Sequence, residues 1–326
     1  MRRVGLLLVF SAAAVLAAES LGGPVAGYVA GSPKPELRAI FGVPGALRFS
    51  DPLPLPDGIT RIRLAPGQDY ALVERANASA GALVLAGGSV DHLQTLDGVM
   101  ARADWVVFSS SGTAAVLFSA SAGRLQVVTG LPDAPQMAAD LDVAALPELP
   151  ATAAVDDTAA LLLIASRQSV YAVPKAGAPR LVFSGSRIAA LAVLRNGKDA
   201  AVSDSGAASV FLVENAASAP AARVLASGIE GVGDIFPSQD GTALFAAAGG
   251  ILWIDLASGA VQSFAAADPQ ALAAGLVALR NSDTFLFSAR SRQPGWIFFR
   301  EGNSGRVVFV PARSPDRELP ARGGVR

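Results

Sequence analysis

The chain has 326 residues, of which 52% are hydrophobic and 16% charged, with a formal net charge of −1. This length supports one large core or two ordinary domains, and the missing basic excess argues against nucleic acid as a partner. With one histidine and no cysteine, the sequence excludes Cys/His zinc sites, disulfides and a cysteine nucleophile.

The first 18 residues have the composition of a secretory signal peptide. An arginine pair precedes an apolar core at 4–16, and the small residues Ala17 and Ala18 follow. The alternative, a retained membrane anchor, fits less well because the apolar run is shorter than a typical span. We therefore expect an exported protein, secreted or periplasmic, that begins near Glu19 and has no membrane span after cleavage.

Residues 19–58 form a glycine- and proline-rich lead-in with one hairpin candidate, 26–42. Prolines near its end cannot donate ladder hydrogen bonds, so this part is expected to run over the surface. The apolar residues of the hairpin should pack against the first or the last repeat: Tyr28, Val29, Leu37, Ile40 and Phe41.

From residue 59 a four-strand unit recurs about every 40–47 residues, the range of propeller blades. The tripeptides Leu194-Arg195-Asn196 and Leu279-Arg280-Asn281 mark the same point of two copies. The turn between the first two strands of the unit appears six times, at 63–73, 107–117, 154–163, 193–202, 235–245 and 278–287. Acidic residues in these turns, such as Asp156 and Asp240, are expected to close them by accepting backbone hydrogen bonds.

The stretch 231–266 contains one complete unit, with strands expected near 232–236, 242–248, 251–256 and 260–264. The two middle runs are apolar throughout rather than alternating, which predicts strands covered on both faces. Stacking of one small sheet on copies of itself provides that cover. Two alanine-rich pieces fit the pattern less clearly: 135–146 is interpreted as an irregular fourth strand and 269–279 as a loop entering the last repeat, with short helices as the alternative.

The phrases FPSQDGTALFAA (236–247) and FSSSGTAAVLFSA (108–120) are similar to the turn-and-strand phrase of β-propeller repeats in the WD40/YVTN-like superfamily. The phrase ILWIDLASGAV (251–261) resembles the hairpin that follows it. The Gly-His and Trp-Asp signatures of WD40 blades are missing. The resemblance covers about 59–310 and implies a propeller of the secreted bacterial type.

The sequence therefore predicts an all-β protein, a β-propeller of four-stranded antiparallel blades spanning 59–312, followed by a disordered tail at 313–326. One arrangement has six full blades with the N-terminal hairpin covering the seam. The other places the hairpin as a half-size seventh blade. Six is favoured because only six strands of the channel-lining type are apparent.

Few residues suggest chemistry. His92 falls on an outer strand, where a surface role is expected, and Trp105, Trp253 and Trp296 lie in or beside apolar runs that favour core packing. The loops that lead into each blade should gather at the channel mouth, which gives a candidate ligand site of Asp104, Arg187, Glu230, Asp234 and Asp268.

Carboxylates converging on an axis can bind Ca²⁺, as in lactonase-type propellers, whose sites resemble a Glu/Asn/Asn/Asp set. The mouth loops of this chain offer Asp and Glu but no Asn. We expect a monomeric, non-catalytic binding or scaffold protein that presents propeller loops to a protein or small-molecule partner and needs no cofactor. The alternative is a lactonase-type hydrolase or lyase with a metal at the mouth.

Overall fold

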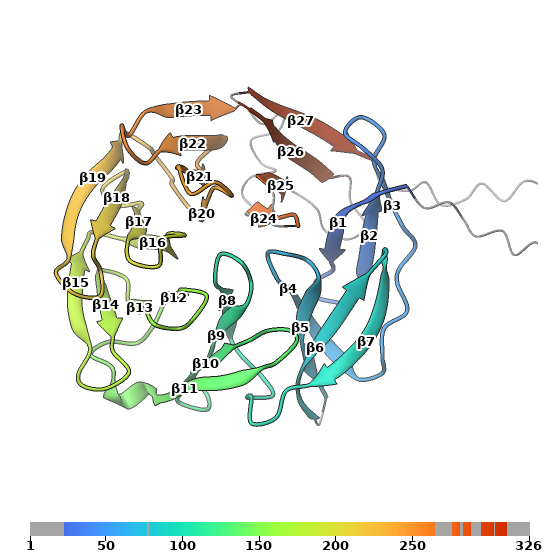
Figure 1. The fold of residues 1–326 in the computed structure, drawn as a ribbon, viewed down its shortest axis with the longest axis horizontal. Coiled ribbons are helices and arrows are strands. Elements are labelled where there is room, and N and C mark those ends of the chain that lie inside the picture. Colours follow the sequence, from blue (N-terminus) through green and yellow to red (C-terminus); the bar gives the residue numbers. More distant parts are fainter. Residues whose placement is uncertain are drawn as a thin grey trace, which may run out of the picture.

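The computed structural model describes residues 23–76, 78–264, 276–280, 283–287, 295–302 and 304–311. These residues form antiparallel sheets that stand as a ring around a central axis (Figure 1). Their only helix is the short 3₁₀ turn Val143–Ala145. The expected signal peptide and tail lie outside the described residues. Within the described part of the chain, no helix is long and apolar enough to cross a membrane.

Six sheets have four strands each, in sequence order from the axis outward. The first three are β4(Ile59–Leu64), β5(Tyr70–Arg75), β6(Ala78–Ala86), β7(Ser89–Thr95); β8(Trp105–Phe108), β9(Ala114–Ser119), β10(Arg124–Thr129), β11(Gln136–Asp142); and β12(Thr152–Val155), β13(Leu162–Ala165), β14(Ser169–Val173), β15(Arg180–Ser184). The alanine-rich piece 135–146 thus contains a fourth strand, as expected.

The other three four-stranded sheets repeat the same order. They are β16(Ile188–Val193), β17(Ala200–Asp204), β18(Ser209–Glu214), β19(Ala221–Ser227); β20(Ile235–Pro237), β21(Ala243–Ala247), β22(Ile251–Asp255), β23(Val261–Phe264); and β24(Leu276–Ala278), β25(Thr284–Phe287), β26(Gly295–Glu301), β27(Ser304–Val310). The four strands expected within 231–266 are confirmed.

The repeated turn phrase forms each inner hairpin through local hydrogen bonds. Between β20 and β21, Gly241 N–H donates to the Ser238 carbonyl at 3.0 Å, with Gly241 at φ 71°. The Asp240 carboxylate accepts from the Ser238 hydroxyl at 2.6 Å and from the Thr242 N–H at 3.0 Å. These bonds, from Ser238 foremost, lower the pKa of Asp240 to about 2. Asp156 accepts bonds from Thr158 and Leu161 in the same way, so the turn role expected for the two residues is confirmed.

The core lies between neighbouring sheets. Second strands such as β9, β17 and β21 are buried along their whole length. Each is covered on both faces by the adjacent sheets, so one cluster combines Val182 and Phe183 of β15 with Ala200 and Val202 of β17 in the next sheet. Continuous apolar runs are therefore buried by blade stacking, as the sequence predicted.

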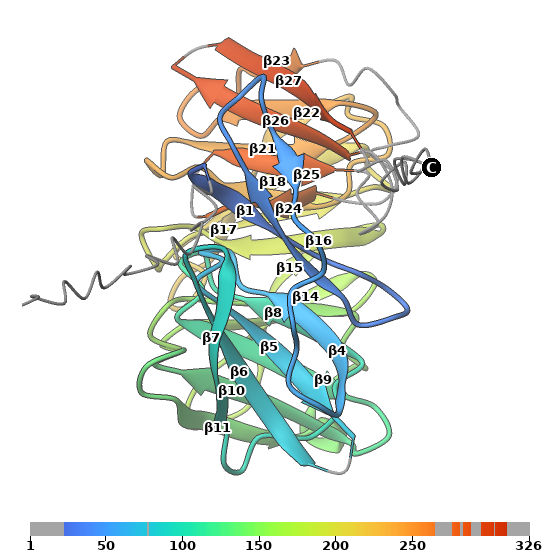
Figure 2. The ribbon, with the colours of Figure 1, turned by 90° about the vertical axis from the view of Figure 1, so that its right-hand side faces the viewer.

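The N-terminal residues form a seventh sheet, β1(Val25–Ala30), β2(Leu37–Phe41) and β3(Arg48–Phe49), in that order. We call it the N-terminal sheet. It stands between the first four-stranded sheet (β4–β7) and the last one (β24–β27), as Figures 1 and 2 show. The ring is thus a seven-bladed propeller, which corrects the preference for six blades: β1 is a seventh channel-lining strand.

Both faces of the N-terminal sheet are buried. Tyr28 and Leu37 pack with Ile59, Ile62 and other residues of the first four-stranded sheet. On the other side, a second cluster forms the joint with the last four-stranded sheet, which we call the seam: Val29, Ile40, Leu47, Phe49, Leu279, Leu286, Ile297 and Val310. The predicted burial of the hairpin is confirmed, with Phe41 partly buried.

Gln68 ties the N-terminal sheet to its neighbours. This buried side chain accepts from the Tyr28 N–H at 2.7 Å and donates to the Tyr28 carbonyl at 3.2 Å and the Ala278 carbonyl at 3.1 Å. Gly27 makes the approach feasible, because a Cβ there would lie 2.7 Å from Gln68 Oε1 and 2.9 Å from Leu279 Cδ2. Arg280 adds a 2.7 Å bond to the Val25 carbonyl.

Candidate functional site

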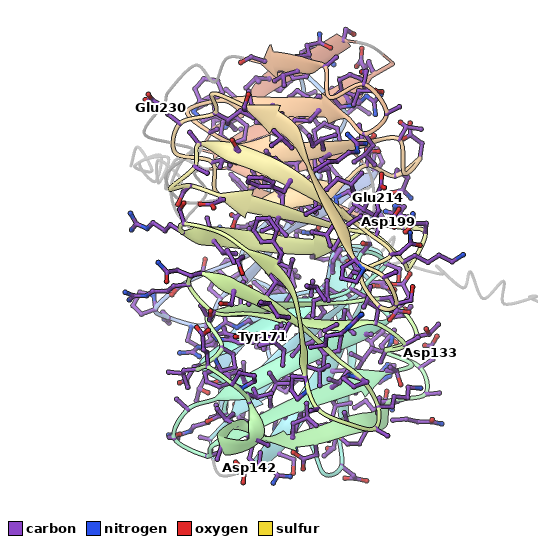
Figure 3. All side chains as sticks on the ribbon, turned by 90° about the vertical axis from the view of Figure 1, so that its left-hand side faces the viewer. Asp133, Asp142, Tyr171, Asp199, Glu214 and Glu230 are labelled. Atoms are coloured by element: carbon purple, nitrogen blue, oxygen red, sulfur yellow. The ribbon has the colours of Figure 1, made fainter. Side chains whose placement is uncertain are left out.

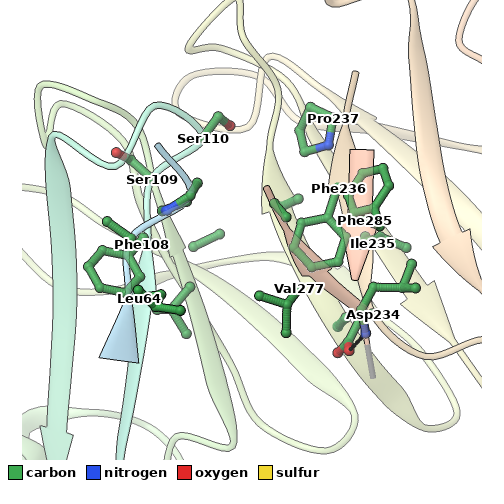
Figure 4. A pocket seen from close by; sticks show the side chains of 18 of the residues that line it. Leu64, Phe108, Ser109, Ser110, Asp234, Ile235, Phe236, Pro237, Val277 and Phe285 are labelled. Carbon is green, nitrogen blue, oxygen red and sulfur yellow. Dashed lines mark hydrogen bonds between the residues drawn. The ribbon is translucent and has the colours of Figure 1, made fainter. Parts of the chain in front are cut away.

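A cavity of about 640 Å³ follows the axis of the ring and is lined by the inner strands of all seven sheets. Most of its lining is apolar. Leu64 and Phe108 lie on one side of it and Phe236 and Val277 on another (Figure 4). Val277 keeps 41% of its surface exposed in the described structure, which is unusual for a large apolar side chain on an inner strand. Cavities of this size and lining are typical of small-molecule sites.

Charged residues are few in the lining: Arg63, Arg195, Asp234 and Asp283. Asp234 lies at one end of the cavity and Ser109, Ser110 and Pro237 at the other (Figure 4). We call these ends the Asp234 mouth, where chain segments enter the inner strands, and the turn mouth, where the inner hairpins turn.

Asp234 is the one predicted site residue that lines the cavity among those the structure describes. It precedes β20, and its side chain is exposed. The Leu276 N–H of the neighbouring, last four-stranded sheet lies 3.4 Å from Asp234 Oδ2, which is a weak contact between the two blades. The carboxylate is therefore available to a ligand at this mouth.

The structure does not bring the other predicted site residues to the cavity. The Asp104 carboxylate accepts from the Ala120 N–H at 2.7 Å, and the Arg187 N–H donates to Asp204 at 2.8 Å. Glu230 is exposed and lies on the face of the ring opposite the face that carries Asp199 and Glu214 (Figure 3). Asp268 lies outside the described residues. Within the described ranges, no three His, Cys, Asp or Glu residues cluster to hold a metal ion.

Asp204, which sequence reasoning missed, organises the segment before β16. Its side chain is buried and accepts from four backbone N–H groups at 2.6–3.1 Å, those of Ser186, Arg187, Gly206 and Ala207. Burial alone would raise the pKa of Asp204, but the four hydrogen bonds outweigh it and the pKa is lowered. The Asp-Ser-Gly sequence after an apolar strand was the available signal.

We expect Asp204→Asn to destabilise the fold at neutral pH by about 1–3 kcal/mol, because an amide oxygen replaces two charged acceptors. The folded-state pKa lies below the unfolded value of about 3.9, so the contribution of the carboxylate is present above that pH and is lost as pH falls further. Urea unfolding of both proteins should therefore show a difference at pH 7 that shrinks toward pH 2. Asp133→Asn, at an exposed position, is the control; an equal loss in both variants would contradict this role.

Two arginines of β4, Arg61 and Arg63, lie near a single carboxylate, that of Glu74, close to the Asp234 mouth. Arg61 pairs with Glu74 at 3.1 Å and donates to the Ala103 carbonyl at 2.8 Å. Arg63 makes a long bond of 3.3 Å to the Asp104 carbonyl, and its buried Nε has no partner. Burial foremost, and then Arg61, lowers the pKa of Arg63. Arg63 therefore lines the cavity as an incompletely bonded cation.

At the turn mouth, hydrogen bonds connect neighbouring blades. Arg195 donates to the Ser238 carbonyl at 2.8 Å, and the Gln239 N–H donates to Asp283 at 2.8 Å. Asp283 also pairs with Arg300 at 2.9 Å, so its charge is already compensated. This end is suited to holding the blades together rather than to binding a charged ligand.

The closed ring of antiparallel sheets around an apolar channel defines the molecule as a seven-bladed β-propeller. The sequence matches no protein-family model and no curated protein. Solved structures of propeller type are similar to it in fold. A protein from Bacteroides fragilis NCTC 9343 described as a "putative 6-phosphogluconolactonase" aligns with a TM-score of 0.52 and 15% identity over 88% of this chain and 92% of that one.

Two further solved structures show the same likeness. A protein of unknown function from Desulfotomaculum acetoxidans has a TM-score of 0.54 and 15% identity, covering 89% of this chain and all of that one (100%). A protein from Lactobacillus plantarum has a TM-score of 0.53 and 12% identity, covering 88% and 96% of the two chains. At these identities the likeness shows the fold alone.

Proposed function

We propose that this protein is a non-catalytic binding propeller that takes up a small, largely apolar molecule in its central cavity. The observation that carries the proposal is the 640 Å³ space walled by apolar side chains of every inner strand. The exposed Val277 in that wall supports it, because apolar surface left uncovered inside a cavity favours an apolar occupant.

The signal-like segment at the start of the sequence supports export of the chain to the periplasm or beyond, where it would act as a monomer without a cofactor. The lactonase-type alternative needs several carboxylates converging on the axis. The described lining has Asp234 and Asp283 at opposite mouths, and Asp283 is paired with Arg300. This arrangement does not favour a metal-dependent hydrolase.

A neutral fluorescent probe, N-phenyl-1-naphthylamine, tests the proposal. We expect saturable binding to the parent protein and a loss of about tenfold or more in affinity for Val277→Trp, because the indole fills the cavity. Fluorescence titration measures both.

Val261→Trp is the matched control, since Val261 is similarly exposed but lies on the outer strand β23. It should bind the probe like the parent protein. Equal effects of the two substitutions, or no saturable binding, would remove the cavity as the binding site.

A further inference from the structure

We infer that the ligand of the cavity is an organic anion whose acidic group is bound by Arg63, an inference that rests on the proposed function. The apolar walls fit the body of such a molecule, and the guanidinium fits a carboxylate or sulfonate. The apolar walls alone or the guanidinium alone would not identify the class of ligand, but the guanidinium beside apolar walls does.

The first step is the charge balance around Arg63. Two guanidinium groups, those of Arg61 and Arg63, have one carboxylate near them, and Glu74 forms its 3.1 Å ion pair with Arg61. No carboxylate of the described residues lies within ion-pair distance of Arg63; the charged group bonds only to the Asp104 carbonyl, at 3.3 Å. The wall therefore carries an excess positive charge at this point.

The second step is burial. Arg63 is partly buried on the inner strand β4, and its Nε is fully covered without a hydrogen-bond partner. Buried cations are ordinarily paired, because removal from water without a partner is costly. The covered Nε is closed to a ligand, so an acidic group in the cavity would bind the terminal nitrogens of the guanidinium, where the 3.3 Å bond to the Asp104 carbonyl leaves donors unfilled.

The third step is the position of the opposite charge. Asp234 lies at the Asp234 mouth on the other side of the ring, on the sheet β20–β23, whereas Arg63 belongs to β4. An anion bound at Arg63 thus holds its acidic group on the wall across the channel from Asp234, and its body lies along the apolar lining. This polarity of the cavity favours one orientation of the ligand.

Two probes that differ by a single acidic group test the inference. 8-Anilinonaphthalene-1-sulfonate has the same rings as N-phenyl-1-naphthylamine and adds the sulfonate. We expect Arg63→Gln to weaken binding of the sulfonate by about tenfold or more and to leave the neutral probe within about twofold. Arg63→Lys, which keeps the charge, should retain most of the sulfonate affinity and serves as the second variant if Arg63→Gln does not fold.

Arg48→Gln is the control for net charge, because Arg48 is exposed on β3 and does not line the cavity. Arg48→Gln should change the affinity for neither the sulfonate probe nor the neutral probe. If Arg63→Gln leaves sulfonate binding intact while Val277→Trp abolishes it, the cavity binds ligands without Arg63, and this inference fails but the proposed function survives. If Val277→Trp also has no effect, both fail. An equal loss of both probes in Arg63→Gln would likewise overturn the role of the charge.

Discussion

A chain that begins after residue 55, and so lacks the N-terminal sheet, should not form a stable monomer. The deletion uncovers Ile59, Ile62 and Leu83 on one side of the gap and Leu286 and Ile297 on the other, all buried in the intact ring. It also leaves two sheet faces unpartnered, which favours aggregation. Size-exclusion chromatography and thermal unfolding of the truncated protein measure the effect.

A point substitution separates loss of packing from loss of the whole sheet. Ile40→Ala, at a position with no exposed surface in the seam, should lower the free energy of unfolding by about 2–5 kcal/mol. Val43→Ala, at an exposed position of the same sheet region, should change it by less than about 0.5 kcal/mol. A truncated chain that stays monomeric with an unchanged melting temperature would mean that the N-terminal sheet is not needed for closure.

Phe245→Ala should be among the most destabilising single substitutions in the protein, by about 3–5 kcal/mol. Phe245 is fully buried on β21, where its ring lies 4.9 Å from that of Phe285 and 6.0 Å from that of Phe298. The Arg300 guanidinium lies over it at 5.9 Å. Removal of the ring leaves a cavity between the last two sheets that these rigid neighbours cannot fill.

Phe309→Ala is the matched control, since the same atoms are removed from an outer strand where the ring is 46% exposed. It should cost less than about 1 kcal/mol. Urea unfolding, with the denaturant dependence compared between variants, gives both values. Similar losses for Phe245→Ala and Phe309→Ala would contradict the stacking of the last two sheets as the source of stability.

Much of the fold could be predicted because its signals are local. The turn phrase around Ser238 and Asp240 specifies a hairpin through bonds within five residues, and Ser109 and Asp156 close two other turns with similar side-chain bonds. The burial of Trp253 was predicted less well. Trp253 was expected within a fully covered strand, but it is only partly buried, and its covered indole Nε1 lacks a partner in the described structure.

The seventh blade could not be settled from sequence, because its evidence is non-local. Its third strand has two residues, Arg48–Phe49, too few for any periodic pattern. The decisive contacts come from Gln68, a turn residue whose amide bonds β1. Nothing in the composition around Gln68 distinguishes that role from an ordinary exposed turn.

The candidate site was predicted only in part for a similar reason. The rule that the loops leading into each blade gather at the channel mouth placed Asp234 there. That rule cannot tell which side chains of these loops turn inward and which bond the backbone of another loop, as Asp104 does. Arg63 was not singled out. The available signal was a charged residue in the run Ile62-Arg63-Leu64 of a strand expected to line the channel.

The seam joins the first and the last sheet in sequence order, and this has a consequence for the order of assembly. The hydrogen bonds that close the ring here connect residues 255 positions apart across the seam and 210 positions apart from Gln68 to the last sheet. By contrast, the Tyr70 hydroxyl reaches the carbonyl of Gly112 in the adjacent sheet across only 42. Loop-closure entropy therefore makes the seam about 1.5 kcal/mol harder to form than a joint between consecutive sheets. During translation the N-terminal sheet emerges first and stays uncovered on one side until the last sheet has been made. Of the seven blades, the one that is synthesised first is thus completed last, and the nascent ring stays open until the strands of the last sheet have been made.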